Sequence, residues 1–378
     1  MGNDTVAVIG CGTSAGAAAS LTASAGLSTV LIGPAGPSKP FLQTLSSRSR
    51  AILARMRISG DLDDGDFAPC LSRKSAWGTD AVAEIESIRD PWGPASFVVQ
   101  PALDRLMLRV AIRSGATRVP HSFVRAEALP EGWALDLSDG STIYAGFVID
   151  ASGRTAAFAR RTGATRRRID RLVAAAVRLN PSGESRGFTF VESVADGWWY
   201  TGLAPNGHAS VIFFTDSDLP GARNTAHAGG WNRVLDETAH SRFLVSSATP
   251  EPLVLCASSE YLSPCAQANW AAVGDAQATY DPLSSEGLLQ ALESSEQASK
   301  AAIAYFDGDR QATRNYRATR ELVYLKYLSD RALVYGMELR WPQAPFWKRR
   351  SAYQATRNSP SHPLMQSLAS QSNQMEIA

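Results

Sequence analysis

The chain has 378 residues, of which 44% are hydrophobic and 19% charged, and its 37 basic and 36 acidic residues leave a net charge of +1. This length exceeds what one hydrophobic core usually supports, so one composite domain or two closely packed domains are expected. The near-zero net charge excludes a global field that would draw the chain to nucleic acid or to an anionic membrane.

The cysteines and the apolar runs define the expected environment. Cys11, Cys70, Cys256 and Cys265 form no CxxC pair, and no histidine lies at metal-ligand spacing. Neither a disulfide nor a metal site is therefore expected. No run reaches the ~18 apolar residues that span a bilayer, and the N-terminus carries no basic export segment. These features predict a cytoplasmic protein that binds neither membrane nor nucleic acid.

The first 32 residues predict a compact βαβ unit. Residues 5–10 (TVAVIG) are a β-branched run that ends in glycine, and residues 14–25 are an Ala-rich helix candidate. A second apolar run follows at residues 29–32. A β-branched run, a helix candidate and a second apolar run within about 30 residues form a compact βαβ opening.

The turn of this unit carries Gly10-x-Gly12-x-x-Ala15. Gly10 permits the tight turn, Gly12 leaves bare backbone for a pyrophosphate, and Ala15 keeps helix and strand close, while the helix N-terminus faces the phosphates. Ser14 belongs to the same predicted cofactor site. A purely structural glycine turn is the alternative, and the strand-turn-helix context favours dinucleotide binding.

The second strand lacks one element of this motif. It normally ends in Asp or Glu, which binds the adenosine ribose. Here Ile32 runs into Gly-Pro. The sequence therefore predicts weaker cofactor binding, or a ribose held by backbone groups.

The remaining chain is expected to leave the dinucleotide fold and return to it, which implies interleaved domains. The expected elements are, in order, a helix at 41–58, loops and short strands at 62–96, a helix at 101–113, strands at 117–150 with a hairpin turn at 138–140, antiparallel strands at 170–258 with a turn at Asn206-Gly207, a strand at 270–276, and helices at 287–305 and 309–340. The expected domains are 1–170 with substrate-domain strands around 62–98, the antiparallel sheet at 171–264, the second part of the first domain at 265–305, and a helical region with a loose tail at 306–378.

A second motif, Val273-Gly274-Asp275-Ala276, is followed by Asp281-Pro282-Leu283-Ser284-Ser285-Glu286-Gly287. The arrangement resembles the GD motif and the DP...G segment of flavoprotein monooxygenases built like para-hydroxybenzoate hydroxylase, and of the related flavin-dependent tryptophan halogenases. The resemblance implies FAD as cofactor. It also implies an α/β structure: a glutathione-reductase-like FAD-binding fold with an inserted antiparallel β-sheet substrate domain and a helical C-terminus. A strand-end aspartate that caps a turn is the alternative.

The resemblance implies the cofactor contacts residue by residue. In that family the aspartate of the GD motif, here Asp275, bonds the ribityl chain. The helix that starts near Gly287 directs its positive end at the flavin, with Pro282 and Leu288 beside it. Gln100 stands where the family carries an Arg or Gln that contacts the flavin chain, although a helix cap is an equally simple role for it.

The implied reaction is hydroxylation of an aromatic ring through a flavin C4a-hydroperoxide, with NAD(P)H or a flavin reductase as electron source. Trp199, Ser285 and Glu286 are the candidate catalytic residues. The segment Trp198-Trp199-Tyr200 is expected to line the chamber of an aromatic substrate. The aromatic and arginine series at 324–350 is similar to that of the monooxygenase-like maturases that hydroxylate a tryptophan of a partner polypeptide in tryptophylquinone biogenesis. A helical stripe packed on the sheet is the plainer role of this series.

Two alternative functions stay open. Halogenases of the superfamily carry a WxWxIP segment and an active-site lysine. Here the segment from Trp198 to Leu203 lacks the Ile-Pro, and Lys74 is not at the matching distance. Halogenation of an aromatic substrate is the first alternative. The second is a degenerate scaffold protein that binds FAD weakly, which the missing acid after Ile32 would permit and the presence of Gly12 and Asp275 disfavours.

Overall fold

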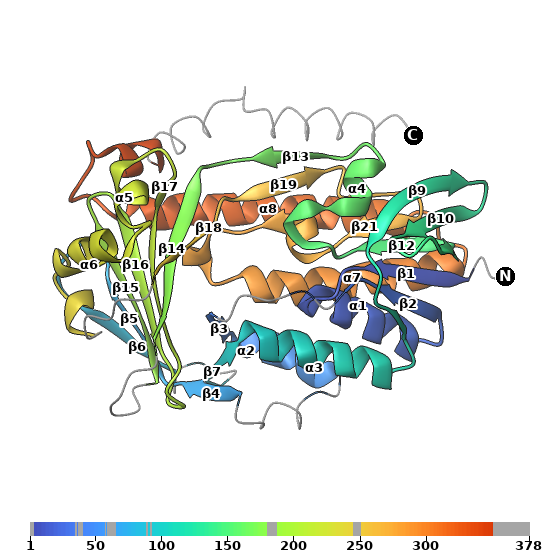
Figure 1. Cartoon of the computed structure of the whole chain (residues 1–378), viewed down its shortest axis with the longest axis horizontal. Helices are drawn as coiled ribbons and strands as arrows, with labels where there is room; N and C mark the ends of the chain where they lie inside the picture. The colour runs from blue at the N-terminus through green and yellow to red at the C-terminus, as the bar shows by residue number, and fades with distance from the viewer. Residues whose placement is uncertain are drawn as a thin grey trace.

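The computed structural model describes residues 4–34, 36, 41–56, 58, 66–87, 90, 93–179, 187–244 and 251–350. Two large sheets occupy opposite ends of the molecule, and long helices run between them (Figure 1). The helices are α1 (Thr13–Ser24), α2 (Ser47–Arg55), α3 (Gln100–Arg113), α4 (Ala157–Arg161), α5 (Pro220–Asn224), α6 (Ala228–Asp236), α7 (Gly287–Phe306) and α8 (Ala312–Gly336), with short 3-10 turns η3 (Gly153–Thr155), η4 (Ser241–Phe243), η5 (Gly274–Ala276) and η6 (Pro282–Ser284).

The strands alternate with these helices along the chain. They are β1 (Thr5–Ile9), β2 (Ser28–Ile32), β3 (Leu42–Leu45), β4 (Phe67–Cys70), β5 (Ser72–Ala76), β6 (Ala83–Glu86), β7 (Ala95–Val99), β8 (Thr117–Val119), β9 (Phe123–Leu129), β10 (Gly132–Leu137), β11 (Thr142–Ala145), β12 (Phe147–Asp150), β13 (Thr165–Arg168), β14 (Leu172–Leu179), β15 (Phe188–Val194), β16 (Gly197–Leu203), β17 (Ala209–Asp216), β18 (Leu253–Cys256), β19 (Glu260–Ser263), β20 (Ala266–Gln267), β21 (Trp270–Ala272) and β22 (Ala278–Thr279).

Parallel pairing around β1 builds a six-stranded sheet of order β20-β21-β12-β1-β2-β8. Successive side chains of a strand point to opposite faces. Val6 and Val8 of β1 therefore enter the core under α1 and α7, whereas Ala7 and Ile9 enter the core covered by α4 and the strands β10 and β11. Apolar residues on both faces suit a sheet that is covered on both sides. The βαβ unit expected from the first 32 residues is confirmed.

The second large sheet has seven strands in the order β18-β14-β17-β16-β15-β5-β6. Its central pairs are antiparallel, and the expected Asn206-Gly207 turn joins β16 to β17 with Gly207 at φ +82°. The two faces of this sheet pack against different hydrophobic cores. Trp198 and Phe214 pack on one face, and Trp199 and Phe213 pack on the other.

Helix α8 connects the two sheets (Figure 1). Near its start, the Tyr316 hydroxyl donates a hydrogen bond of 2.6 Å to the carbonyl oxygen of Ala272 in the six-stranded sheet. Near its end, the Tyr335 hydroxyl accepts a hydrogen bond of 3.0 Å from Trp198 Nε1 in the seven-stranded sheet. The 25-residue helix therefore fixes the distance between the sheets.

Two expectations about the elements need correction. The helix expected at 41–58 is a strand followed by a shorter helix, because Leu42–Leu45 pairs with β7 and Leu42 N donates to Ser210 Oγ across 2.9 Å. Ser46 then caps α2 by accepting from Ser49 N. The region expected as strands at 170–258 also contains α5 and α6, which cover one face of the seven-stranded sheet. Within the described part of the chain, no helix is both long and apolar enough to cross a membrane.

Candidate active site

The turn between β1 and α1 borders a cleft of about 620 Å³. Gly10 has φ +134°, and a Cβ there would lie 2.2 Å from the carbonyl oxygen of Ala151, so glycine is required. A Cβ on Gly12 would meet a single neighbour within 4 Å, Asp104 Oδ1 at 3.6 Å, so its backbone is open to the cleft. The cleft is lined by Gly10, Cys11, Gly12, Pro34, Gly36, Pro101, Asp104, Arg105, Leu108, Ala151, Ser152 and Gly153.

Asp104 holds the N-terminus of α1 and was not anticipated from the sequence. Its Oδ1 accepts hydrogen bonds from Thr13 N at 2.8 Å and from Thr13 Oγ1 at 2.7 Å. Gln100 Nε2 donates to the same oxygen at 2.9 Å and to Thr13 Oγ1 at 3.1 Å. The Gln100 amide is thus engaged with the α1 terminus and does not line this cleft. Gln100 and Asp104 are four residues apart on α3, and this spacing is the sequence signal from which their contact can be predicted.

Two other residues of the predicted cofactor set lie behind the turn. Ala15 is fully buried in the core between α1 and the sheet. Ser14 faces the GD turn, because a Cβ on Gly274 would lie 2.1 Å from Ser14 Oγ. Both residues hold the turn closely against its neighbours and contribute no side chain to the cleft.

The GD turn is held from three sides. Gly274 has φ +55°, and its N–H donates to Ser294 Oγ at 2.9 Å. Arg166 donates to the carbonyl oxygens of Asp275 at 2.6 Å and Ala276 at 2.9 Å and pairs with Glu260 at 3.2 Å. The side chain of Asp275 stays half exposed, with its Oδ2 3.9 Å from Arg154 Nε.

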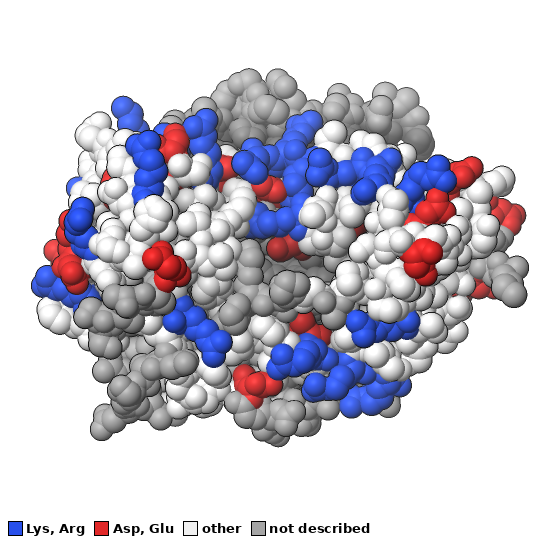
Figure 2. Space-filling view, viewed as in Figure 1, with Lys and Arg blue, Asp and Glu red and all other residues white. Residues whose placement is uncertain are grey.

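Arg166 belongs to a run of three arginines at residues 166–168, and such basic runs usually form a solvated surface. Figure 2 shows basic side chains gathered over β13, where this run lies. The Arg166 side chain is nevertheless only 11% exposed. Burial lowers its pKa, and the neighbouring Glu260 carboxylate opposes that shift. Arg166 is therefore a structural support of the GD turn, which the run of three arginines did not reveal.

The segment after Asp281 is fixed by α8. The Asp281 carboxylate caps η6 by accepting from Leu283 N at 3.0 Å, and its other oxygen accepts from Arg331 Nε and Tyr335 Oη, each at 2.9 Å. Asp281 is 1% exposed, so these bonds satisfy a fully buried charge. Ser285 then adopts φ +53°, a strained conformation for a residue with a side chain, directly before α7.

A second cavity of about 290 Å³ lies between this segment and the seven-stranded sheet. It brings together five residues of the predicted site, Asp275, Pro282, Ser285, Gly287 and Leu288. The remaining lining residues are Phe41, Leu42, Gln43, Thr44, Arg154, Ala174, Ala176, Tyr200, Ile212, Phe214, Leu255, Cys256, Ala257 and Tyr280.

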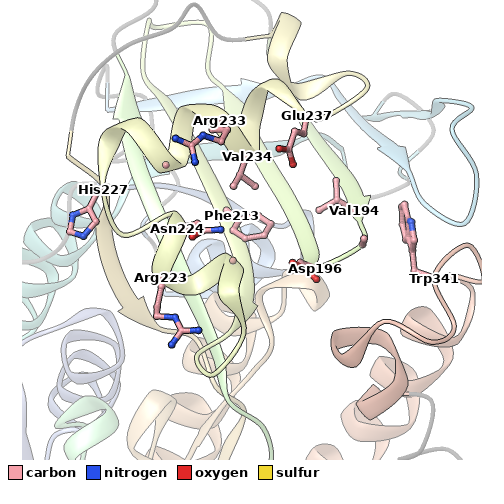
Figure 3. Close-up of a pocket in the computed structure, with 13 residues that line it drawn as sticks. Val194, Asp196, Phe213, Arg223, Asn224, His227, Arg233, Val234, Glu237 and Trp341 are labelled. Carbon is pink, nitrogen blue, oxygen red and sulfur yellow. The ribbon is translucent and has the colours of Figure 1, made fainter.

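Trp199 does not line this cavity. Alternate side chains of β16 point to opposite faces, so Tyr200 reaches the cavity and Trp199 points away. The Trp199 ring packs against Phe213 at 4.9 Å and Trp231 at 5.2 Å. On that face lies a different cavity of about 560 Å³, bordered by the β15–β16 turn, α5 and α6 (Figure 3). Of the expected lining residues Trp198, Trp199 and Tyr200, only Tyr200 lines this cavity, so the expected place of Trp199 is corrected.

Glu286 does not line the cavity either. It stands at the N-cap of α7, and its carboxyl interacts with charges on α2, α7 and α8. Burial, and then the Asp330 carboxylate, raise its pKa. Of the three candidate catalytic residues, Ser285 alone has a place in the cavity wall.

The two cavities and the two glycine turns fit FAD. Bare backbone at Gly12 leaves room for a diphosphate at the α1 terminus, where the Asp104 carboxylate is occupied with the Thr13 N–H. Asp275 at the second cavity suits the ribityl hydroxyls. The N-terminus of α7 at Gly287 suits negative charge on the flavin ring. Pro34 and Gly36 line the first cleft where an acidic residue would normally meet the ribose.

The comparisons with known proteins agree with this geometry. Residues 95–362 match the tryptophan halogenase family. LodB of Marinomonas mediterranea, which is described as a FAD-dependent oxidoreductase, is 26% identical over 302 residues, covering 78% of this chain and 81% of LodB.

Three solved structures share the fold. The myxobacterial chondrochloren halogenase CndH has a TM-score of 0.83 at 20% identity and covers 96% of this chain and 92% of its own. QhpG, a peptidyl tryptophan dihydroxylase essential for tryptophylquinone cofactor biogenesis, has a TM-score of 0.75 at 21% identity, covering 91% of this chain and 78% of its own. The flavin-dependent brominase Bmp2 has a TM-score of 0.75 at 16% identity, covering 94% and 98%. The expected resemblance, fold class, FAD cofactor and flavoprotein enzyme class are confirmed.

Proposed function

This chain belongs to the tryptophan halogenase family, and from that premise we propose that it is a FAD-dependent monooxygenase that hydroxylates an aromatic ring, with a tryptophan side chain of a partner polypeptide as the favoured substrate. NAD(P)H or a flavin reductase would supply the electrons. Reduced FAD supplies the activation of O2, so the residues of the chain bind the ring, orient it and keep water away.

The observation that carries this proposal is the wall that the seven-stranded sheet gives to the second cavity. Ala174 and Ala176 of β14 stand beside Phe214 and Ile212 of β17 in register. The two short side chains leave a recess between larger apolar ones, in a cavity that Ser285 and Gly287 also line. A planar ring fits such a recess, because aromatic and aliphatic faces exclude water from both sides of it.

A tryptophan within a polypeptide is favoured over a free small aromatic by the similarity to QhpG, whose substrate is a peptidyl tryptophan. The aromatic and arginine series at 324–350 adds no support of its own. In this chain much of that series packs inward, since Tyr324, Tyr327 and Tyr335 are each at most 3% exposed. The inward packing assigns these side chains to the scaffold, so the polypeptide substrate rests on the relative alone.

Halogenation is the second candidate, because the matched family and two of the similar structures are halogenating enzymes. The described lining of the second cavity contains no lysine. Lys74 lies on β5, where its ammonium stands 4.8 Å from the centre of the Phe188 ring and 3.4 Å from Glu84 Oε1. The Lys74 ammonium is thus engaged with Phe188 and Glu84 at the surface of β5 and does not line the cavity. This placement supports hydroxylation over halogenation.

Mass spectrometry separates these candidates. The FAD-loaded protein, a flavin reductase with NADH, and O2 would be offered N-acetyl-tryptophanamide, a tryptophan-containing polypeptide and a simple phenol, with chloride or bromide present. A gain of one oxygen on the indole of the first two supports the proposal. A halogen atom on any product would favour halogenation over hydroxylation. Oxygen on the phenol alone would refute the tryptophan substrate, and unaltered substrates with bound FAD would favour the scaffold function.

A further inference from the structure

One hydroxyl pair stands out in the cavity wall opposite the predicted flavin segment. Tyr200 of β16 and Thr44 of β3 both line the second cavity, and their oxygens lie 3.2 Å apart. The other side chains that the seven-stranded sheet contributes to this wall are apolar except for the Cys256 thiol. Tyr200 is therefore the strong hydrogen-bonding group on the sheet side of the cavity.

The pair has unused hydrogen-bonding capacity. Each hydroxyl carries one proton and acceptor lone pairs, and their mutual bond uses one proton and one lone pair. No further hydrogen bond joins either hydroxyl to another described residue. Burial raises the pKa of Tyr200 to about 12, so its hydroxyl stays neutral and keeps its proton at physiological pH. Whichever hydroxyl donates to the other, the Tyr200 oxygen keeps a free acceptor site.

The direction of the Tyr200 side chain depends on the lack of a side chain at Gly202. Gly202 follows Tyr200 by two residues on β16 and therefore faces the same side of the sheet. A Cβ there would lie 3.0 Å from Tyr200 Oη and 3.3 Å from Leu42 Cδ2. The Tyr200 ring thus lies along its own strand over Gly202, with the hydroxyl directed at Thr44.

The row of residues across the sheet gives the distance from the Tyr200 strand to the recess. Ala176 pairs with Ile212, and Ile212 pairs with Tyr200, so the three stand at one level on adjacent strands. An aromatic ring in the recess at Ala176 is thus two strand spacings, or ~10 Å, from the Tyr200 backbone. The Tyr200 side chain runs from there along its own strand over Gly202, so its hydroxyl meets a ring that spans the cavity from the recess towards Thr44.

We infer, building on the proposed function, that Tyr200 Oη accepts the N–H of an indole substrate and, positioned by Thr44 and Gly202, selects which edge of the ring faces the flavin. Tyr200 is the specificity-determining residue of this site, and Thr44 and Gly202 are its positioning residues. The substrate class that this arrangement recognises is an indole with a free ring N–H.

The test compares two ligands of nearly equal shape by calorimetry with the FAD-loaded protein. They are N-acetyl-tryptophanamide and its benzothiophene analogue, in which sulfur replaces the ring N–H. The parent is expected to bind the indole about tenfold more tightly, the scale of one neutral hydrogen bond whose loss strands a polar group. Tyr200→Phe should bind both ligands equally. Thr44→Val and Gly202→Ala should reduce the ratio while leaving FAD bound.

Tyr144→Phe is the matched control, because its ring is 57% exposed on β11 and does not line the cavity. Its binding ratio should equal that of the parent. An equal affinity of the parent for both ligands, a preserved ratio in Tyr200→Phe, or no binding of the indole would each overturn the inference. If the parent binds the indole selectively but does not oxygenate it, the hydrogen bond between the indole and Tyr200 stands and the proposed hydroxylation is refuted.

Discussion

Tyr335 donates its hydroxyl proton to Asp281 Oδ2 across 2.9 Å and accepts a hydrogen bond from Trp198 Nε1 across 3.0 Å. One phenol thereby joins α8, the segment that begins at Asp281 and the seven-stranded sheet. The cavity between that segment and the sheet is therefore held at a fixed width by a residue that does not line it.

Removing this phenolic hydroxyl should destabilise the protein. Tyr335→Phe leaves the Trp198 N–H without its partner and takes one donor from the buried Asp281 carboxylate. We expect the free energy of unfolding to fall by ~1–3 kcal/mol, measured by urea denaturation. Tyr144→Phe, at an exposed position, should leave the midpoint unchanged. Equal midpoints for Tyr335→Phe and the parent would show that the connection carries no stability.

A side chain at Gly12 should abolish FAD binding and leave the fold intact. Valine there occupies the volume in front of the α1 terminus that the diphosphate needs, and the nearest protein atom is 3.6 Å from the new Cβ. Flavin retained after gel filtration and the circular dichroism spectrum report the two effects. Gly229→Ala, on α6 with open space around it, is the control and should retain flavin. An unchanged FAD content in Gly12→Val would refute the phosphate site.

Asp275 should contribute to FAD affinity through its carboxylate. Asp275→Ala is expected to weaken binding by at least ~1.5 kcal/mol, roughly tenfold, the scale of a charge-assisted hydrogen bond. Asp275→Asn keeps the shape and should lose less. Titration of the apoprotein with FAD by fluorescence quenching measures both. Parent-like affinity in Asp275→Ala would reduce Asp275 to a turn residue.

Acid should weaken the contact between the end of α8 and the seven-stranded sheet. Burial would raise the pKa of Glu338, but bonds from Arg340, Ser193 and the Gly78 N–H outweigh it and bring the pKa to about 2, below the ordinary 4.5. A lowered folded-state pKa stabilises the fold above pH 4.5, and this contribution is lost as the pH falls from 4.5 towards 2. At ~1.36 kcal/mol per unit it amounts to at most ~3 kcal/mol.

Urea denaturation at several pH values tests this contribution. Glu338→Gln should be less stable than the parent at pH 7 and should lose less stability between pH 4.5 and pH 2. Other carboxyls titrate in both proteins, so the difference between the two curves isolates Glu338. Parallel curves would contradict the assignment.

The sequence predicts those parts of the fold whose signal is local. Gly10, Gly207 and Gly274 each adopt a positive φ that favours glycine, and Gly12 leaves the backbone open, so short sequence motifs identify these turns. The segment at 42–45 was predicted as helix because its apolar spacing suits one. Its pairing with β7 and its bond to Ser210 decide in favour of a strand, and both partners are distant in sequence.

Local motifs likewise predict one part of the candidate site, and the packing of segments distant in sequence decides the rest. Asp275, Ser285 and Gly287 belong to one short segment, so a motif finds them together. Which aromatic residue of β16 faces the cavity depends on the register of the sheet, and a shift of one residue exchanges Trp199 for Tyr200. No sequence pattern links Asp104 on α3 to Thr13 on α1, since their meeting depends on helix packing across the domain.

The origin of the oxygen atom distinguishes hydroxylation at the flavin from halogenation and from release of hydrogen peroxide. The FAD-loaded protein would be reduced without oxygen, freed of excess reductant, and mixed with 18O2 and N-acetyl-tryptophanamide in ordinary water with bromide present. Hydroxylation at the flavin predicts an indole product that carries one 18O atom, formed at no more than one per flavin. Reoxidised flavin with only labelled hydrogen peroxide and unaltered indole, or a brominated indole without label, would contradict it.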